Sequence, residues 1–197
     1  LLRLEEDPRK AATKAAQRDE EPRELHIRAL LTTGQYTNAL TATTNATSKL
    51  PFSVRMLWMA HEVHKFNNQP EKSTAALIEM NRLATQMMWR YRTAPDLVAL
   101  GRMALLNGAD PKLVLERLYD AAEKSDPNSR VVPLAKGELA LSKGDFTLAS
   151  RVYQIALKKF QNDAEIHYGI AKSFESSDRK VMQKHLEAAL AANPNHI

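Results

Sequence analysis

The sequence contains no cysteine and few of the residues that interrupt regular structure. Its 197 residues include no Cys, 6 Gly and 9 Pro. The absence of cysteine excludes disulfide frameworks, thiolate zinc sites and cysteine nucleophiles. The scarcity of turn residues argues against an all-β fold, which needs many of them. An apolar content of 44% is ordinary for a folded soluble domain and argues against disorder.

Long apolar runs are also missing. No segment approaches the roughly 18 apolar residues of a membrane-spanning helix, so we expect none here. The chain begins with Leu1 and not with Met, so the lack of a signal peptide says little about the compartment. A protein without cysteine is tolerated in reducing and oxidising compartments alike. We favour a cytoplasmic location and leave an extracytoplasmic one open.

The charges show no concentration of one sign. Lys and Arg number 28 against 23 Asp and Glu, which gives a net charge of +5, and the two signs are interspersed. A surplus of this size serves solubility, and no dense basic stripe appears that would track a phosphate backbone. We therefore do not expect nucleic-acid binding.

What the sequence does contain is an internal repeat. Its clearest unit covers residues 131–161, where Gly137 lies in an apolar helix and Gly144 opens a turn seven residues later. A second predicted helix follows, and one face of it carries small and aromatic residues spaced by four and three, namely Ala149, Tyr153 and Ala156. That is the spacing of neighbours on a helix surface. Small residues let paired helices approach closely, and the turn glycine allows the positive φ that ends a helix.

The same spacing recurs along the chain. The equivalent first-helix residues are separated by 34, 40, 36 and 34 positions, and we call them the marker residues: Ile27, His61, Gly101, Gly137 and Ala171. This pattern resembles the tetratricopeptide repeat (TPR), whose period is 34. The resemblance extends over roughly residues 20–195.

The resemblance implies an all-α fold, namely an α-solenoid of about five stacked antiparallel helix pairs wound as a right-handed superhelix. We assign residues 21–197 to this repeat domain. Residues 1–20 are highly charged and form either a charged N-terminal segment or the tail of a helix from an earlier repeat. We expect both ends to be cut from a longer array.

The second repeat departs from the pattern. After Pro70, apolar residues keep helical spacing to about Tyr91, which predicts one long helix that ends before Pro95. This lengthened helix accounts for the separation of 40. Thr93 with Asp96 then predicts a cap for the following helix.

This irregular repeat is rich in Met and aromatic residues. We expect Met80 and Met87 to lie in the core. Trp89 falls outside the apolar stripe beside Arg90 and Arg92, which makes it a candidate interface anchor.

No catalytic constellation is present. The segment His61-Glu62-Val63-His64 places its histidines three apart, whereas the zinc-protease helix needs His-Glu-x-x-His and a third ligand. We expect both histidines to be partly buried structural residues. No phosphate-binding loop and no Gly-x-Ser-x-Gly elbow occur either. We therefore predict no enzymatic activity, no cofactor and no metal.

In the TPR family, first helices line a concave groove that takes peptides. Carried over by repeat position, the candidate groove residues are Arg28, Trp58, Glu62, Arg102, Glu138, Tyr168 and Lys172. Trp58 and Tyr168 are large amphipathic rings that could anchor a ligand. The alternative for each residue is plain solenoid surface or packing against a neighbouring helix. Glu24 and Arg28 occupy positions where one subfamily uses Lys and Asn to grip a peptide carboxylate, so we predict no such clamp.

The resemblance implies a non-catalytic scaffold that binds a protein or peptide. One alternative is the repeat region of a larger enzyme, such as a peptidase or transferase, that orients substrates or mediates oligomerisation. RNA binding by a related helical array is a third hypothesis, and the unequal separations of 40 and 36 count against it. Homo-oligomerisation and the identity of the partner stay open.

Overall fold

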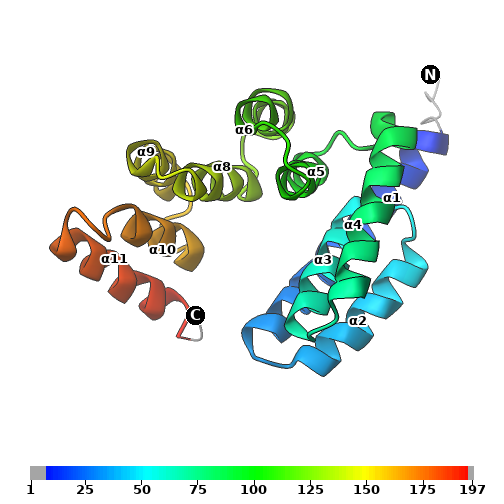
Figure 1. The fold of residues 1–197 in the computed structure, drawn as a ribbon, viewed down its shortest axis with the longest axis horizontal. Helices are drawn as coiled ribbons and strands as arrows, with labels where there is room; N and C mark the ends of the chain where they lie inside the picture. The colour runs from blue at the N-terminus through cyan, green and yellow to red at the C-terminus, as the bar shows by residue number, and fades with distance from the viewer. Residues whose placement is uncertain (1–7, 195–197) are drawn as a thin grey trace, which may run out of the picture. The chain divides into compact units, whose positions relative to one another are not determined.

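The computed structural model describes the backbone of residues 8–194 and the side chains of residues 19–194. Every regular element in that range is helical, as the repeat pattern predicts (Figure 1). The chain divides into two compact units, Leu1–Gln86 and Met87–Ile197. Within the described part of the chain, no helix is both long and apolar enough to cross a bilayer.

The first unit contains two helix pairs. They are formed by α1 (Pro8–Thr32), α2 (Tyr36–Lys49), α3 (Val54–Phe66) and α4 (Pro70–Met87). Helix α1 contacts α2 and α3, and α2 contacts α3. The turns that close the pairs contain Gly34 at φ 71° and Asn68 at φ 53°, and glycine and asparagine are the residues that tolerate this left-handed conformation. The core between the helices is rich in aliphatic residues and methionine, including Ile27, Met56, Met59, Met80 and Leu83.

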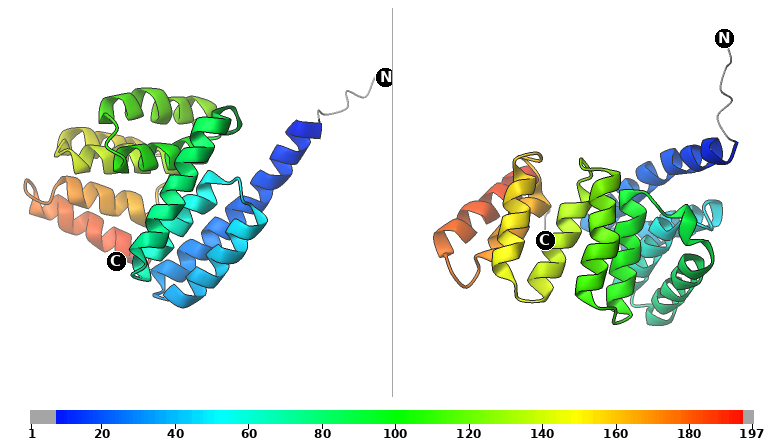
Figure 2. Two further views of the ribbon diagram at one scale, coloured as in Figure 1. Left: turned by 45° about the vertical axis from the view of Figure 1, so that its right-hand side comes forward. Right: turned by 90° about the horizontal axis from the view of Figure 1, so that it is seen from above.

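The second unit contains three helix pairs. The first helices of the pairs are α5 (Ala94–Leu106), α8 (Val131–Ser142) and α10 (Ala164–Ser173). Helix α9 (Phe146–Leu157) pairs with α8, and α11 (Arg179–Ala192) pairs with α10, as Figure 2 shows. The partner of α5 is a continuous helical segment made of α6 (Pro111–Val114), a π-helical turn η2 (Leu115–Tyr119) and α7 (Asp120–Ser125).

The π-helical turn occurs in the unit whose spacing is irregular. Relative to the clearest repeat, this unit has two extra residues around Asp110 and Pro111. A π-turn takes up an extra residue inside a helix without breaking it. Tyr119, the last residue of this turn, packs directly on Gly101, where an added Cβ would lie 2.3 Å from the tyrosine ring. Tyr153 packs in the same way against two glycines, Gly137 and Gly169.

The lengthened helix of the second repeat is confirmed, but it ends before the predicted position near Tyr91. Helix α4 ends at Met87, a single 3₁₀ turn η1 (Met88–Arg90) follows, and α5 begins at Ala94. Thr93 caps α5, because its hydroxyl accepts from the Asp96 amide at 3.4 Å and donates to the Asp96 carboxylate at 2.7 Å. Met80 is fully buried and Met87 is partly buried.

The N-terminal boundary differs from the expectation. Helix α1 runs from Pro8 to Thr32 and passes residue 20 without interruption, although Pro22 lies inside it. Residues 8–20 therefore continue the helix that carries the marker Ile27 and are not separated from it by a turn. Residues 1–7 of the proposed N-terminal segment lie outside the described part of the chain.

Candidate protein-interaction surface

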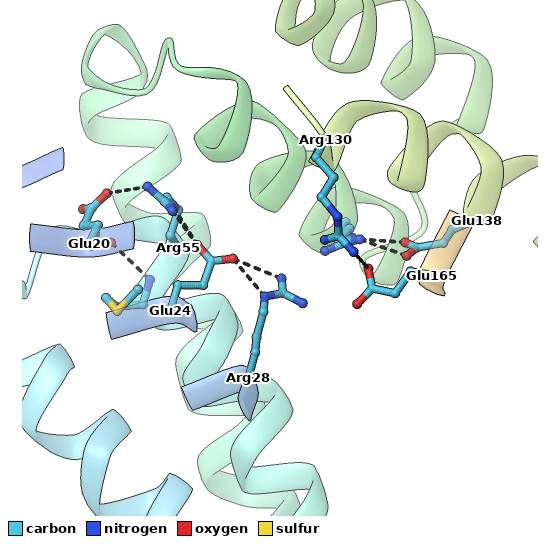
Figure 3. Close-up of polar contacts among 10 residues, drawn as sticks. Glu20, Glu24, Arg28, Arg55, Arg130, Glu138 and Glu165 are labelled. Carbon is cyan, nitrogen blue, oxygen red and sulfur yellow. Dashed lines mark hydrogen bonds and ion pairs between the residues drawn. The ribbon is translucent and has the colours of Figure 1, made fainter. Parts of the chain in front are cut away.

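The first helices of the second unit lie next to one another. Helix α5 contacts α8, and α8 contacts α10. Arg102 of α5 donates through Nη2 to both carboxylate oxygens of Glu138 on α8, at 2.8 and 3.0 Å (Figure 3). Two of the predicted groove residues therefore form an ion pair that joins consecutive repeats.

A second ionic contact joins α8 to α10. Arg130, the residue before α8, pairs with Asp163 and lies 3.0 Å from the Glu165 carboxylate (Figure 3). Asp163 also caps α10 by accepting from the amides of Glu165 and Ile166 at 3.0 and 3.2 Å. Burial opposes ionisation of Asp163, but Arg130 and the cap amides outweigh it and lower the pKa of the carboxyl. Asp163 thus fixes both the start of α10 and its contact with the preceding repeat.

The first unit carries a more deeply buried network. Arg55 of α3 donates to Glu24 of α1 through Nη2 and Nε at 2.6 and 2.9 Å, and lies 3.4 Å from Glu20 (Figure 3). Arg28 approaches the other oxygen of Glu24 at 3.1 Å. Burial raises the cost of ionising Glu24, yet Arg55 and Arg28 prevail and lower the pKa of Glu24 below its ordinary value of 4.5. The predicted groove residue Arg28 is therefore part of a structural network.

The three aromatic candidates differ in exposure. Tyr168 on α10 is 40% exposed, as an anchor on an open face would be. Trp89 in the η1 turn is 66% exposed, and Arg92 donates to its carbonyl at 3.1 Å. Trp58 is only 8% exposed, and its ring lies 5.2 Å from that of His61. The expectation of an open Trp58 ring is corrected, because this side chain is buried in packing contacts.

The remaining two candidates lie at helix surfaces. Lys172 is partly buried and pairs with Glu175 at the end of α10. Glu62 on α3 is also partly buried.

The sequence analysis missed several members of the ionic networks that join the first helices, namely Glu20, Arg55, Arg130, Asp163 and Glu165. One signal was available in the repeat. The residue after each marker alternates in sign along the chain, through Arg28, Glu62, Arg102, Glu138 and Lys172. Opposite charges at one position of consecutive repeats indicate pairing between first helices, as Arg102 and Glu138 show.

The histidines of the second repeat have structural roles, as predicted. The Nδ1 atom of His61 lies 2.8 Å from the Ser73 hydroxyl, which links α3 to α4. Desolvation lowers the pKa of the buried His61. The Nδ1 atom of His64 lies 3.0 Å from the Gln69 side chain. Among the residues that the structure describes, no group of three or more His, Asp and Glu side chains could hold a metal ion.

Comparison with known proteins supports the fold. No family model matches this sequence, and no curated protein matches it. The crystal structure of PilW, a type IV pilus biogenesis factor, superposes with a TM-score of 0.55 at 12% identity, over 88% of this chain and 77% of that one. YrrB, described as a TPR protein with an unusual peptide-binding site, gives 0.47 at 15% identity over 96% and 94% of the two chains. MamA gives 0.46 at 15% identity over 85% and 88%.

These neighbours are TPR proteins. The protein described here accordingly has a TPR-like fold, that of an all-α solenoid. At identities this low the likeness concerns the fold alone.

Proposed function

We propose that this protein is a non-catalytic scaffold that binds a protein or peptide partner, and that the first-helix face of its second unit makes the contact. The observation that carries this proposal is an exposed aromatic side chain beside paired charges on α5, α8 and α10. These three neighbouring helices present an exposed aromatic residue, Tyr168, beside charges that are already paired within the protein.

The charge pattern of this face favours a particular kind of partner. Arg102 pairs with Glu138, and Lys172 pairs with Glu175. A strongly charged peptide would have to displace these pairs, and rim charges of this kind add little to affinity. Tyr168 instead offers a large amphipathic ring of the type enriched at energetic centres of interfaces. We therefore expect a peptide that contributes an apolar or aromatic side chain.

The neighbouring apolar residues support the same partner. Leu105 on α5 and Leu141 on α8 occupy the repeat position that follows Arg102 and Glu138 by one helical turn. Both side chains are only partly buried. Tyr168 lies three residues before its marker and the two leucines lie four after theirs, so a partner segment that covers them all must extend about two helical turns along these helices. Burial of apolar area along such a stretch is how a helical groove gains affinity.

A photo-crosslinking residue introduced at a single position tests the assignment in the full-length protein within its own cells. The probe replaces Tyr168 in one variant and Ile155 in the other. Ile155 is a matched control, because it lies on the second helix α9 and is 57% exposed. We expect a specific adduct from position 168 that is absent from position 155.

The partner identified in this way then allows a direct affinity measurement. Tyr168→Ala should weaken binding by at least tenfold, whereas Ile155→Ala should leave it unchanged. Far-UV circular dichroism checks that both variants remain helical. Equal crosslinking at the two positions, or an unchanged affinity of a folded Tyr168→Ala protein, would contradict the assignment.

A further inference from the structure

Two histidines from the last helix pair face each other. His167 lies on α10 and His185 lies on α11, and their Nδ1 atoms are 2.9 Å apart. The ring centres are 5.2 Å apart and the ring planes are inclined by 35°. The two residues are 18 positions apart in sequence, so no short motif reveals the pair.

The second nitrogen of His167 is fixed by the backbone. Its Nε2 atom lies 3.0 Å from the carbonyl oxygen of Gln161. A carbonyl only accepts hydrogen bonds, so Nε2 carries the proton and the lone pair of neutral His167 is on Nδ1. A backbone carbonyl that orients an imidazole in this way is the usual outer partner of a metal-binding histidine.

The other requirements of a metal-binding pair are also met. Both side chains are partly exposed, which leaves a path for an ion from solvent. Two nitrogen atoms bound at about 2.0–2.1 Å and at right angles to each other would be about 2.9 Å apart. The observed separation of the two Nδ1 atoms matches this value.

We propose that His167 and His185 form a binding site for a divalent late-transition metal ion. The proton between the two Nδ1 atoms moves through solvent to the Nε2 atom of His185, so both rings bind the metal through Nδ1 as neutral ligands. Imidazole ligands select zinc, copper and nickel over the oxygen-preferring magnesium and calcium. Copper(II) should bind most tightly, because affinities follow the Irving–Williams order and its tetragonal geometry suits two nitrogens at right angles. Water or a donor from another molecule would fill the remaining positions, since no third described side chain completes the set.

The site would fasten the last helix to its neighbour. Ala189 is the one residue of α11 with a buried side chain. A metal bridge to His167 on α10 would therefore add a strong contact to a helix whose other apolar side chains are partly buried or exposed. Metal binding should raise the temperature at which the second unit unfolds.

Titration of the full chain with copper(II) against a competing chelator tests the proposal, with electron paramagnetic resonance to count bound nitrogens. We expect one site with two imidazole nitrogens. His167→Gln and His185→Gln should each weaken it at least tenfold. His26→Gln, which changes an exposed histidine on α1 outside the pair, should have no effect. Equal affinity in the wild type and both pair variants would overturn the proposal.

A measurement on the unaltered protein covers the case in which a variant fails to fold. Copper(II) should raise the unfolding temperature of the wild type by about 5 °C when its free concentration is one hundred times the dissociation constant. A chelator should reverse the shift. A crystal soaked in copper should show an anomalous peak between the two rings. A peak elsewhere, or none, would show that the pair holds only a proton.

Discussion

Arg102 and Glu138 are 36 positions apart, one repeat, and two of their hydrogen bonds join α5 to α8 at 2.8 and 3.0 Å. They occupy the same repeat position, directly after the markers Gly101 and Gly137. Charges of one sign along this row would create a strong field that attracts oppositely charged ligands. The alternation found here instead leaves the face close to neutral and uses its charges to fix neighbouring repeats.

Reversing the sign at both positions tests this pairing. Arg102→Glu and Glu138→Arg should each destabilise the second unit by about 0.5–1 kcal/mol, since Glu138 is well exposed to solvent. The double variant should recover most of that loss because it restores an opposite-charge pair. Urea unfolding followed by circular dichroism measures the free energies. If the two single effects simply add in the double variant, the contact does not couple the repeats.

Substitutions at the close approach of helices around Tyr153 should destabilise the second unit more than the charge reversals do. A Cβ added to Gly137 would lie 2.2 Å from the Tyr153 ring, and one added to Gly169 would lie 2.4 Å from it. The ring is held between both glycines and cannot retreat from either. Gly137→Ala should therefore destabilise the second unit by about 1–3 kcal/mol through overpacking. Thermal unfolding followed by circular dichroism measures the loss.

A matched pair of variants separates overpacking from backbone strain. Gly144 has φ 73° with open space around its Cβ position, so Gly144→Asn should be mild, because asparagine tolerates this conformation. Gly137→Asn should be at least as harmful as Gly137→Ala. In addition, Gly137→Ala should cost less in a Tyr153→Ala background, where the opposing ring is gone. An unchanged cost in that background would show that the ring is not the cause.

The contrast between Tyr153 and Arg55 shows what the sequence could predict. Tyr153, Gly137 and Gly144 act within or next to one repeat, so their spacing along the chain was enough to identify helix, turn and packing face. Arg55 contacts Glu24 from a different helix pair. That contact depends on how two first helices are offset and on which rotamers the long side chains adopt. The spacing of residues along the sequence shows neither of these. The π-turn at Leu115–Tyr119 is similar, since an insertion is visible in the sequence but its placement is decided by packing.

The buried Arg55 network predicts a pH-dependent effect. Arg55→Met should leave Glu20 and Glu24 buried without their shared cation and should destabilise the first unit by about 3 kcal/mol near pH 7. Glu24 has a lowered pKa in the folded protein, so its contribution is present above about pH 4.5 and is lost as the pH falls through the lowered value. The difference between wild type and variant should therefore shrink as the pH falls below 5.

Urea unfolding at pH 7, 5 and 4 measures this difference. Arg82→Met is the matched control in the same unit, because Arg82 pairs with Glu79 on the exposed surface of α4. It should change stability by less than about 0.5 kcal/mol at every pH. A constant penalty for Arg55→Met from pH 7 to 4 would mean that lost packing, and not the carboxylate charge, is responsible.

The chain has two tryptophans in opposite environments, so fluorescence can follow each of them separately. Trp58 is 8% exposed and Trp89 is 66% exposed. Trp58→Phe leaves Trp89 as the reporter, and its emission should be red-shifted and quenched efficiently by acrylamide. Trp89→Phe leaves Trp58, whose emission should be blue-shifted and protected until the first unit unfolds. Equal quenching of the two variants would contradict these environments.

If Trp89 also anchors a partner, the partner found by crosslinking should shift the Trp89 emission to the blue and protect it from acrylamide, because an anchor loses water when it is buried in an interface.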